Sequence, residues 1–556
     1  MAASACPGSA AIPEAVRAKF VENGQGHVFE FVDKGLVPAG VPSVEAFVEQ
    51  LSALADDLPR INKLFASTMA AAAATVDRSS SELTPVDESD VLSAASASAA
   101  ERDSWRARGL AAIAAGQVAV VVLAGGQGTR LGSSLPKAAY DAGLPSGKVL
   151  IRLQAERIQR LRTLAAAVAG ADPSSVHLPW YVMTSPQTHE ATVACFAEHG
   201  NFGLPEEDVT LFQQGQLPSF TPEGKIMLES ATSLALGPDG NGGIYRALHV
   251  NGCVADMETR GVKIVHAYAV DNLVSKVADP VFMGLCLERG VDVGNKVVPK
   301  SSPDEKVGML CRKGGRFSVV EYSDMPAALK QERVGEGEAA PLRFRAGNIC
   351  VHAYDIEFLR GPAHPDRLSE VFHVARKKIP CADPATGLTM SKAAIETENA
   401  VKLEGFIFDV FEEAERTVLL EVDRSDEFSP VKNAPAKGLS DSPDTARQMA
   451  SDEARRWLEA AGATVEGEGL VELSPLVSYG GEGLEALAGA TVSAPCCICL
   501  QAELEGLPSS LAMPSAPSSV TLPSGREAVC AEGCSRPVDA SLGISGNALS
   551  FSVLAL

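Results

Sequence analysis

The amino-acid sequence predicts an α/β fold with a central Rossmann-like, mixed but mostly parallel sheet flanked by helices. It also predicts a helical N-terminal region and a smaller C-terminal domain. Short apolar runs rich in β-branched residues, at 118–123, 180–183, 209–212 and 262–270, alternate with amphipathic stretches, which is the pattern of repeated βαβ units. Glycine or polar residues follow these runs. Because parallel sheets bind ligands at the carboxyl ends of their strands, we expect a site along this edge.

The composition is typical of a globular protein that binds neither nucleic acid nor membranes. The 556 residues are enough for two to four domains, and 46% are apolar and 21% charged. A formal net charge of −22 disfavours an anionic partner, and no apolar run is long enough to span a membrane. The first residues lack the features of a signal or transit peptide, and the 12 cysteines are mostly scattered singly. We therefore expect a cytoplasmic protein with reduced thiols.

The chain divides into four predicted regions: a helical accessory domain, a main α/β domain, a smaller C-terminal domain and a Ser- and Pro-rich extension. In the first, Ser43 is predicted to cap a helix whose apolar residues share one face. Tracts at 70–74 and 93–100 have the composition of less ordered connections. The four regions comprise residues 1–108, 109–426, 427–495 and 496–556.

In the main domain, a crossover helix over 151–164 follows the first strand. A second helix is predicted to begin with Ser185 as its cap and Pro186 as its first residue. Further along, Arg345–Asn348 is predicted to be a turn, and Phe406–Phe411 an apolar helix or strand.

The first strand leads into a glycine-rich stretch that ends at Lys137. Gly125, Gly126 and Gly128 allow the backbone to turn tightly and to approach a ligand. Arg130 and Lys137 add positive charge. The spacing matches neither the Walker A loop nor the dinucleotide-binding fingerprint. A tight strand-to-helix turn is the structural alternative, but the two cations favour a loop that binds nucleotide phosphates.

Three further features could carry chemistry. Asp271, at the end of the fourth strand, is a candidate Mg²⁺ ligand, with capping of a turn as the alternative. A second glycine-dense turn, Pro238–Gly243, could lie against a planar base or a sugar, although such turns are often structural. Four cysteines have the formal spacing of a zinc site: Cys496, Cys499, Cys530 and Cys534. Their long separation favours reduced structural cysteines over zinc ligands.

The stretch Leu123–Gly132, with Pro136 and Lys137, resembles the loop of nucleotide-sugar pyrophosphorylases. Further blocks in order narrow the resemblance to the eukaryotic-type UDP-N-acetylglucosamine (UDP-N-acetylhexosamine) pyrophosphorylases. These blocks are Leu144–Ser146, Phe212–Gly215 with Leu217 and Pro218, Pro238–Gly243, Val270–Asn272, Lys276–Pro280, Val320–Ser323, Ala346–Asn348, His373–Ala375 with Lys377–Pro380, Glu427–Pro430 with Lys432 and Asn433, and Ser474–Tyr479. The resemblance covers residues 117–487. In one departure, Ala138 stands where the family has glycine after the Pro-Lys pair.

The resemblance implies a nucleotidyltransferase-type fold and a set of site residues. The nucleotide would be bound by Leu123, Ala124, Gly125, Gly126, Lys137, Gln214, Gly240, Asp271 and Lys402. The amino-sugar phosphate would be bound by Asn241, Glu321, Tyr322, Asn348 and Lys432. Asp271 would hold Mg²⁺, with Mn²⁺ as the alternative ion. Arg130, Lys137 and Lys432 would be the catalytic cations.

The implied reaction converts UTP and N-acetylglucosamine 1-phosphate into UDP-N-acetylglucosamine and pyrophosphate, by direct attack of the sugar phosphate on the α-phosphorus. The alternatives are a preference for N-acetylgalactosamine, a UDP-glucose or broad UDP-sugar pyrophosphorylase, and a non-catalytic nucleotide-sugar binder. We expect no nucleic-acid or membrane partner, and a monomer or a weak homodimer.

Overall fold

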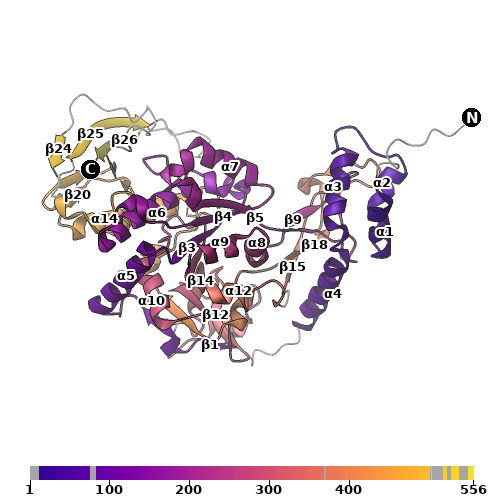
Figure 1. Cartoon of the computed structure of the whole chain (residues 1–556), viewed down its shortest axis with the longest axis horizontal. Coiled ribbons are helices and arrows are strands. Elements are labelled where there is room, and N and C mark those ends of the chain that lie inside the picture. The colour runs from indigo at the N-terminus through magenta and orange to yellow at the C-terminus, as the bar shows by residue number, and fades with distance from the viewer. Residues whose placement is uncertain are drawn as a thin grey trace, which may run out of the picture. The chain divides into compact units, whose positions relative to one another are not determined.

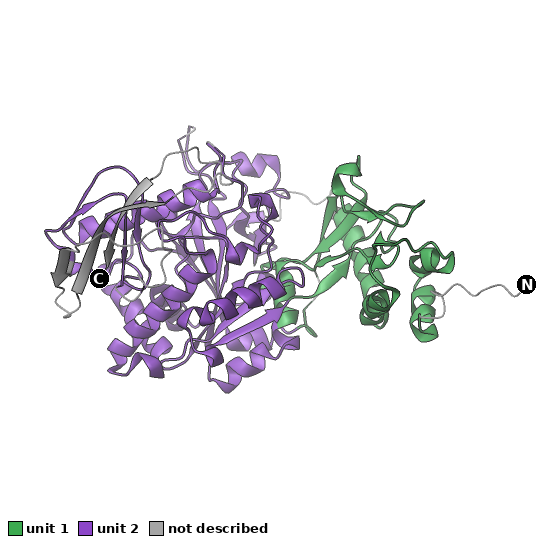
Figure 2. Ribbon diagram, turned by 90° about the horizontal axis from the view of Figure 1, so that it is seen from above, with its two compact units in different colours: residues 1–80, 214–247, 365–410 green, residues 81–213, 248–364, 411–556 purple. Residues whose placement is uncertain are grey.

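The chain divides into two compact units (Figure 2). The computed structural model describes residues 12–75, 83–337, 339–368, 371–436, 438–500 and 503, and the backbone of three strands near the C-terminus. Unit 1 comprises Met1–Ser80, Gln214–Ala247 and Pro365–Val410. Unit 2 comprises Ser81–Gln213, Leu248–His364 and Phe411–Leu556. Each unit is therefore built from segments that are far apart in the sequence.

The centre of unit 2 is an 11-stranded sheet. Its main path runs in the order β2 (Val91–Ser93), β19 (Thr417–Glu421), β11 (Val293–Pro299), β14 (Ala346–Asp355), β10 (Ile264–Ala269), β3 (Val118–Leu123), β4 (Trp180–Thr184) and β5 (Val209–Gln213). β14 is antiparallel to both neighbours, whereas the other pairs of this path are parallel. Three strands branch from the path: β1 (Leu83–Pro85), β12 (Met309–Lys313) and β13 (Arg316–Val320). The predicted mixed, mostly parallel α/β sheet is confirmed.

The four strands expected from apolar runs are β3, β4, β5 and β10. Every residue of β4 is buried, and every residue of β3 except its last, which explains their unbroken apolar sequences. Helices of unit 2 include α5 (Ala99–Ala114), α6 (Leu150–Ala169), α7 (His189–Glu198), α9 (Cys253–Thr259), α10 (Pro280–Arg289), α11 (Ala327–Gln331), α12 (Ile356–Arg360), α13 (Arg424–Glu427) and α14 (Pro443–Ala460). α6 confirms the predicted crossover helix. None of the helices in the described part of the chain is long and apolar enough to cross a membrane.

α5 and α10 lie side by side (Figure 1), with their backbones in close contact. A Cβ on Gly109 would lie 2.0 Å from the carbonyl oxygen of Pro280, and one on Gly284 would lie 1.8 Å from that of Trp105. Only glycine fits at either position, because any side chain would force the helices apart. The domain boundary drawn at 108–109 therefore falls inside α5, a helix that packs within unit 2.

Two sequence expectations in unit 2 are wrong. Ser185 and Pro186 do not begin a helix, because Ser185 is buried after β4 and its hydroxyl donates to the Gly125 carbonyl at 2.9 Å; α7 begins after a further turn. Arg345–Asn348 is not a turn, because Ala346 begins β14, which pairs with β11. In the second case strand pairing outweighs the local preference of glycine and asparagine for turns.

Unit 1 has an apolar core between helices and small sheets. Its helices include α1 (Glu14–Glu22), α2 (Glu30–Asp33), α3 (Val44–Ala55) and α4 (Leu58–Thr75). Its paired strands include β6 (Gln216–Pro218) with β9 (Leu236–Pro238), and β15 (His373–Lys377) with β18 (Ala400–Glu404). Phe20, Phe47 and Leu51 of the helices pack in one cluster with Phe220 and Val401 of the other two segments. Hydrophobic burial therefore joins three separate stretches of chain.

Of the remaining local predictions, some are confirmed and others are wrong. Ser43 does cap α3, with its hydroxyl accepting from the Ala46 N–H at 3.2 Å. The tract 70–74 is not a connection but part of α4, because alanine is a strong helix former. The tract 93–100 joins β2 to α5, as expected. Phe406–Phe411 is neither an α-helix nor a strand, and runs into a short 3₁₀-helix at Asp409–Glu413.

The region after α14 forms a small subdomain of unit 2. In it, β21 (Val471–Leu473) pairs in parallel with β23 (Cys496–Cys499). β26 (Leu549–Ala555), β25 (Glu527–Arg536) and β24 (Ser518–Thr521) extend this sheet. The region boundary drawn at 495–496 thus coincides with the start of a strand that belongs to this sheet.

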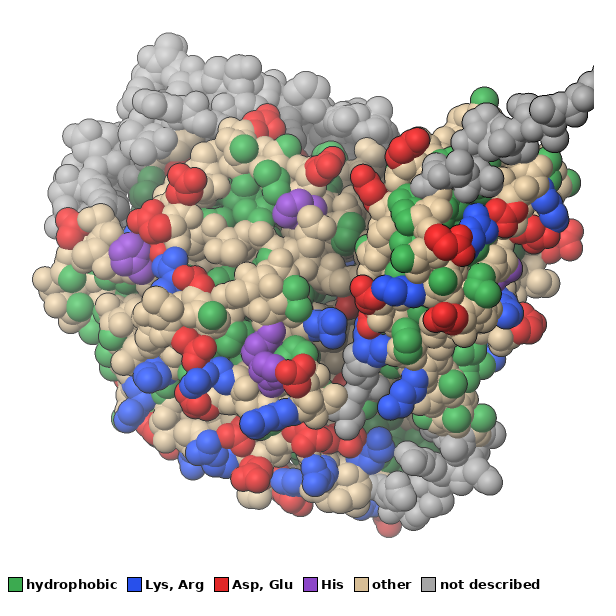
Figure 3. Space-filling model, turned by 45° about the vertical axis from the view of Figure 1, so that its right-hand side comes forward, with side chains coloured by type: hydrophobic (Ala, Val, Ile, Leu, Met, Phe, Trp, Pro, Cys, Tyr) green, Lys and Arg blue, Asp and Glu red, His purple; other side chains and the backbone are tan. Residues whose placement is uncertain are grey.

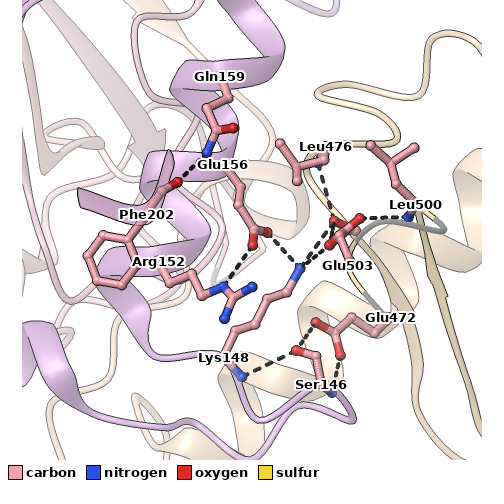
Figure 4. A network of polar contacts seen from close by, with 11 residues as sticks. Ser146, Lys148, Arg152, Glu156, Gln159, Phe202, Glu472, Leu476, Leu500 and Glu503 are labelled. Atoms are coloured by element: carbon pink, nitrogen blue, oxygen red, sulfur yellow. Dashed lines mark hydrogen bonds and ion pairs between the residues drawn. The ribbon is translucent and has the colours of Figure 1, made fainter. Parts of the chain in front are cut away.

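A buried ionic network joins this subdomain to the loop before α6 (Figure 4). Lys148 Nζ lies 2.7 Å from Glu156 Oε2 and 2.6 Å from Glu503 Oε1. Ser146 donates both its backbone N–H and its hydroxyl to the carboxylate of Glu472. Burial by itself lowers the pKa of Lys148, but the surrounding carboxylates raise it more. The lysine therefore stays charged, and it bridges two parts of unit 2.

Glu453, on α14, is a second buried ionisable group, and one of its carboxyl oxygens has no hydrogen-bond partner among the described residues. Burial raises its pKa from 4.5 to about 8. In this range the folded state binds a proton that the unfolded state has released. The free energy of unfolding should therefore fall as the pH rises from about 4.5 to about 8, by up to about 1.4 kcal/mol per pH unit. Urea denaturation of Glu453→Gln at several pH values should show a flatter profile, and an unchanged slope would contradict this.

Candidate active site

Two predicted site residues meet at the carboxyl edge of β3 and β10. These strands are parallel neighbours, and Leu123 pairs with Ala269 at their last residues. The chain leaves both strands at the same edge, and Lys137 Nζ lies 2.9 Å from Asp271 Oδ2. The two side chains are only 16% and 17% exposed. Their interaction is therefore screened by water less than that of a surface pair.

Hydrogen bonds to backbone carbonyls hold the glycine-rich loop after β3, while two of its backbone N–H groups stay free in the described structure. The Lys137 N–H donates to the Gly126 carbonyl at 3.0 Å, and the Ser185 hydroxyl to the Gly125 carbonyl at 2.9 Å. Within the described residues, the N–H groups of Gly125 and Gly126 have no acceptor. Arg130 is exposed and has no ion-pair partner in the described chain. Clustered free N–H groups beside a cation suit a phosphate chain.

The segment that follows α13 brings a third predicted residue to this edge. The Val431 N–H donates to the Asp271 carbonyl at 2.9 Å, so that Lys432 comes next to the end of β10. The Lys432 ammonium lies 5.6 Å from the centre of the Phe428 ring, within reach of a cation–π interaction. The structure thus gathers Lys137, Asp271 and Lys432.

β14, which neighbours β10 in the sheet, has a bulge where its register with β11 shifts. Here Cys350 has a φ of 55°, and its N–H donates to Oδ1 of Asn348 at 2.9 Å. Burial raises the pKa of the Cys350 thiol to about 12. The charges of Asp271 and Glu321 act in the same direction, and that of Lys432 opposes them. No sequence motif indicated the left-handed backbone of Cys350. Strained residues of this kind are common at functional sites.

In unit 1, Gln214 and the turn 238–243 form a separate cluster. Gln214 is 7% exposed, and its Nε2 donates to Asp239 Oδ1 at 3.1 Å and to the Gly240 carbonyl at 2.9 Å. Its Oε1 accepts no hydrogen bond within the described residues. Gly240 has a φ of 93°, and a Cβ would lie 2.2 Å from the Gly405 carbonyl oxygen. Burial raises the pKa of Asp239 to about 6. The cluster therefore holds one fixed amide with a free acceptor.

The remaining predicted residues have contacts within their own units. Asn241 Oδ1 accepts from the Ile407 N–H at 3.0 Å, so part of this amide supports the fold of unit 1. Lys402 Nζ lies 3.0 Å from Glu404 Oε1, on the same strand, β18. In unit 2, Tyr322 is 37% exposed.

Cysteines near the C-terminus form no disulfide bond where their side chains are described. Cys496, Cys497 and Cys499 are buried on β23. The side chains of Cys530 and Cys534 lie outside the described residues. Among the described side chains, no group of three or more His, Cys, Asp and Glu residues could hold a metal ion. Reduced structural cysteines at this place stay a prediction.

Basic side chains on the face of the molecule in Figure 3 are interspersed with acidic ones, among the residues drawn in colour. The chain as a whole carries a formal net charge of −22. Any attraction of Lys137, Lys432 and Arg130 for an anion would therefore act at short range, because salt screens exposed charges beyond about 10 Å.

Comparison with known proteins finds relatives that match most of the chain. The family model of UTP–glucose-1-phosphate uridylyltransferase matches residues 61–442. UDP-N-acetylhexosamine pyrophosphorylase-like protein 1 of Xenopus tropicalis is 41% identical over 504 residues, which are 86% of this chain and 94% of that one. UDP-N-acetylglucosamine pyrophosphorylase of Saccharomyces cerevisiae is 42% identical over 412 residues, 73% of this chain and 83% of that one.

A solved structure also resembles this protein. It is that of the uridine diphosphate N-acetylglucosamine pyrophosphorylase of Trypanosoma brucei in complex with an inhibitor. The TM-score is 0.71 at 27% sequence identity, and the match covers 85% of this chain and 94% of that chain. Fold, ordered motifs and family model agree over most of the sequence. The chain therefore belongs to the UTP–glucose-1-phosphate uridylyltransferase family.

Proposed function

We propose that this protein is an enzyme, a UDP-N-acetylglucosamine diphosphorylase. It makes UDP-N-acetylglucosamine and pyrophosphate from UTP and N-acetyl-α-D-glucosamine 1-phosphate. The observation that carries the proposal is the meeting of Lys137, Asp271 and Lys432 at one sheet edge, beside the free N–H groups of the glycine loop. The relatives named for this chemistry match the chain over most of its length.

The nucleotide contacts follow the positions that the resemblance implies. The backbone of Leu123–Gly126 would hold the phosphates, with Lys137 and Lys402 neutralising their charge. Gln214 would recognise uracil, because its N–H groups are committed within unit 1 and only its Oε1 is free to accept from the N3–H of the base. The backbone of Gly240 would pack against the face of the uracil ring.

Asp271 is the proposed ligand of Mg²⁺, with Mn²⁺ as the alternative. Its Oδ2 forms an ion pair with Lys137. Its Oδ1 has no hydrogen-bond or ion-pair partner among the described residues. One free carboxylate oxygen fits Mg²⁺, which completes its octahedron with water and phosphate oxygens. When bound, the ion would supply positive charge to the phosphate oxygens.

The sugar side of the site would consist of Asn241, Glu321, Tyr322, Asn348 and Lys432. The ionised phosphate oxygen of the sugar phosphate attacks the α-phosphorus of UTP in line. The bond from this phosphorus to the β-phosphate oxygen breaks, and pyrophosphate leaves with the electron pair. The nucleophile carries no proton, so a general base is not needed. Arg130, Lys137 and Lys432 position the phosphates and neutralise their charge.

The deciding experiment is pyrophosphate release from UTP and Mg²⁺ with three sugar phosphates. We expect turnover with N-acetylglucosamine 1-phosphate and slower turnover with glucose 1-phosphate, because the latter lacks the N-acetyl group. N-acetylgalactosamine 1-phosphate differs at a single hydroxyl and tests the sugar preference. Release with none of them would favour a non-catalytic nucleotide-sugar binder. A preference for glucose 1-phosphate would favour a UDP-glucose or broad UDP-sugar pyrophosphorylase.

We further propose that the enzyme works in the cytoplasm as a monomer or weak homodimer. The acidic composition supports the expectation of no nucleic-acid or membrane partner.

A further inference from the structure

We propose that Asn272 and the buried Lys296–Glu427 ion pair are positioning groups that hold Lys432 at the active site. They would fix the backbone of residues 427–432 against the strand end that carries Asp271. This inference rests on the proposed roles of Asp271 and Lys432 in the transfer reaction.

The side chain of Asn272 fastens this segment to the end of β10. It is 2% exposed, its Nδ2 donates to the Glu427 carbonyl at 2.7 Å, and its Oδ1 accepts from the Ser429 N–H at 2.9 Å. The Leu273 N–H donates to the Ser429 carbonyl at 3.3 Å, and the Val431 N–H to the Asp271 carbonyl at 2.9 Å. One buried amide thus supplies two of the four bonds. Removing this amide would leave its buried backbone partners without hydrogen bonds, which is unfavourable away from water.

A buried ion pair holds the start of the same segment. Lys296, on β11, is 0% exposed, and its Nζ lies 2.5 Å from Glu427 Oε2 and 2.6 Å from Asp279 Oδ2. Asp279 also accepts from the Val281 N–H at 3.0 Å, at the start of α10. Glu427 is therefore tied to the sheet and to a helix. After α13 ends at Glu427, residues 428–432 form no helix or multi-residue strand. These contacts therefore fix the backbone up to Val431, and the Lys432 N–H adds a bond to the Asp441 carbonyl at 2.7 Å.

If Asn272 positions Lys432, replacing Asn272 should lower turnover only when Lys432 is present. A displacement of about 1 Å in a catalytic group can cost about 10²-fold in rate. We therefore expect Asn272→Ala to lower kcat at least about 10-fold and to change KM for UTP less than about threefold. In a Lys432→Ala background, the same substitution should lower the residual kcat less than about threefold, because the group it positions is already absent.

The matched control is Asp208→Asn, which changes a buried carboxylate of unit 2 that lies away from the site. Asp208 is 2% exposed, accepts from His177 at 3.0 Å, and precedes β5, at the opposite end of the strand from the carboxyl edge. It should lose thermal stability but keep the wild-type kcat. Glu427→Gln, which keeps the shape of the side chain, provides the same readout if Asn272→Ala fails to fold. All rates are measured where circular dichroism shows the variants folded.

Two results would overturn the inference. One is an Asn272→Ala enzyme, or its Glu427→Gln substitute, that loses stability as Asp208→Asn does but keeps its kcat. The other is an equal fold-loss with and without Lys432. Wild-type turnover in Lys432→Ala alone would instead reject the proposed role of that lysine, so the two failures are distinguishable.

Discussion

Replacement of Lys432 by alanine is expected to lower kcat about 10²–10³-fold while UTP still binds. The backbone of this segment is bonded to the carbonyl of Asp271, and the Lys432 ammonium contributes to the electrostatics at Cys350 together with Asp271. Its charge would act on the attacking sugar phosphate and on the negative charge that develops at the α-phosphate. Binding of UTP draws mainly on the glycine loop and Lys137, so its Kd should change less than about threefold. Pyrophosphate release gives kcat, and titration calorimetry gives the Kd.

Lys313→Ala is the matched control for this substitution. Lys313, on β12, has a side chain that is 40% exposed and lies 3.3 Å from Glu412 Oε1. An exposed pair of this kind contributes about 0–1 kcal/mol, so both kcat and Kd should stay at the wild-type values. Wild-type turnover in Lys432→Ala would reject the catalytic role. A loss of UTP binding equal to the loss of kcat would move the residue from the transfer step to nucleotide binding.

Replacement of Lys148 by methionine is expected to lower the free energy of unfolding by about 3–5 kcal/mol. The side chains of Lys148, Glu156 and Glu503 are 2%, 3% and 5% exposed. Methionine fills similar space, but it leaves the buried Glu503 carboxylate without Lys148 and Glu156 with only the partly exposed Arg152. Removing one partner of a buried ion pair costs far more than the pair contributes, because the remaining charge has lost its water and its counter-charge. Guanidinium chloride denaturation of unit 2, followed by tryptophan fluorescence, measures the change.

Arg152→Ala is the control for the buried network. Arg152 contacts the same carboxylate, with its Nε 3.0 Å from Glu156 Oε1, but its side chain is 27% exposed. Water can replace it, so the loss should stay below about 1 kcal/mol. Equal losses for Lys148→Met and Arg152→Ala would show that burial does not decide the strength of this network.

Local sequence patterns predicted the strands of the site well and the surrounding segments poorly. The run 118–123 is β3 to the residue, because a strand buried on both faces needs an unbroken apolar sequence. The predictions for Ser185 and Arg345–Asn348 are wrong for different reasons. Ser185 is buried and bonded to the Gly125 carbonyl, whereas the pairing of β14 with β11 outweighs the turn preference of Gly347 and Asn348. The isolated Lys432 carried no local signal, and only the resemblance to a family pointed to it.

By itself, the sequence determined that a glycine loop with two cations and an aspartate stand at the ends of strands of a mostly parallel sheet. These features are local, and parallel strands bring their carboxyl ends to a common edge. The tertiary structure alone decided which charges meet. Lys148 finds Glu503 across 355 positions, and Asn272 finds Ser429 across 157. Such contacts depend on which polar groups are buried together when the core forms. The spacing of residues along the chain does not predict which groups these are.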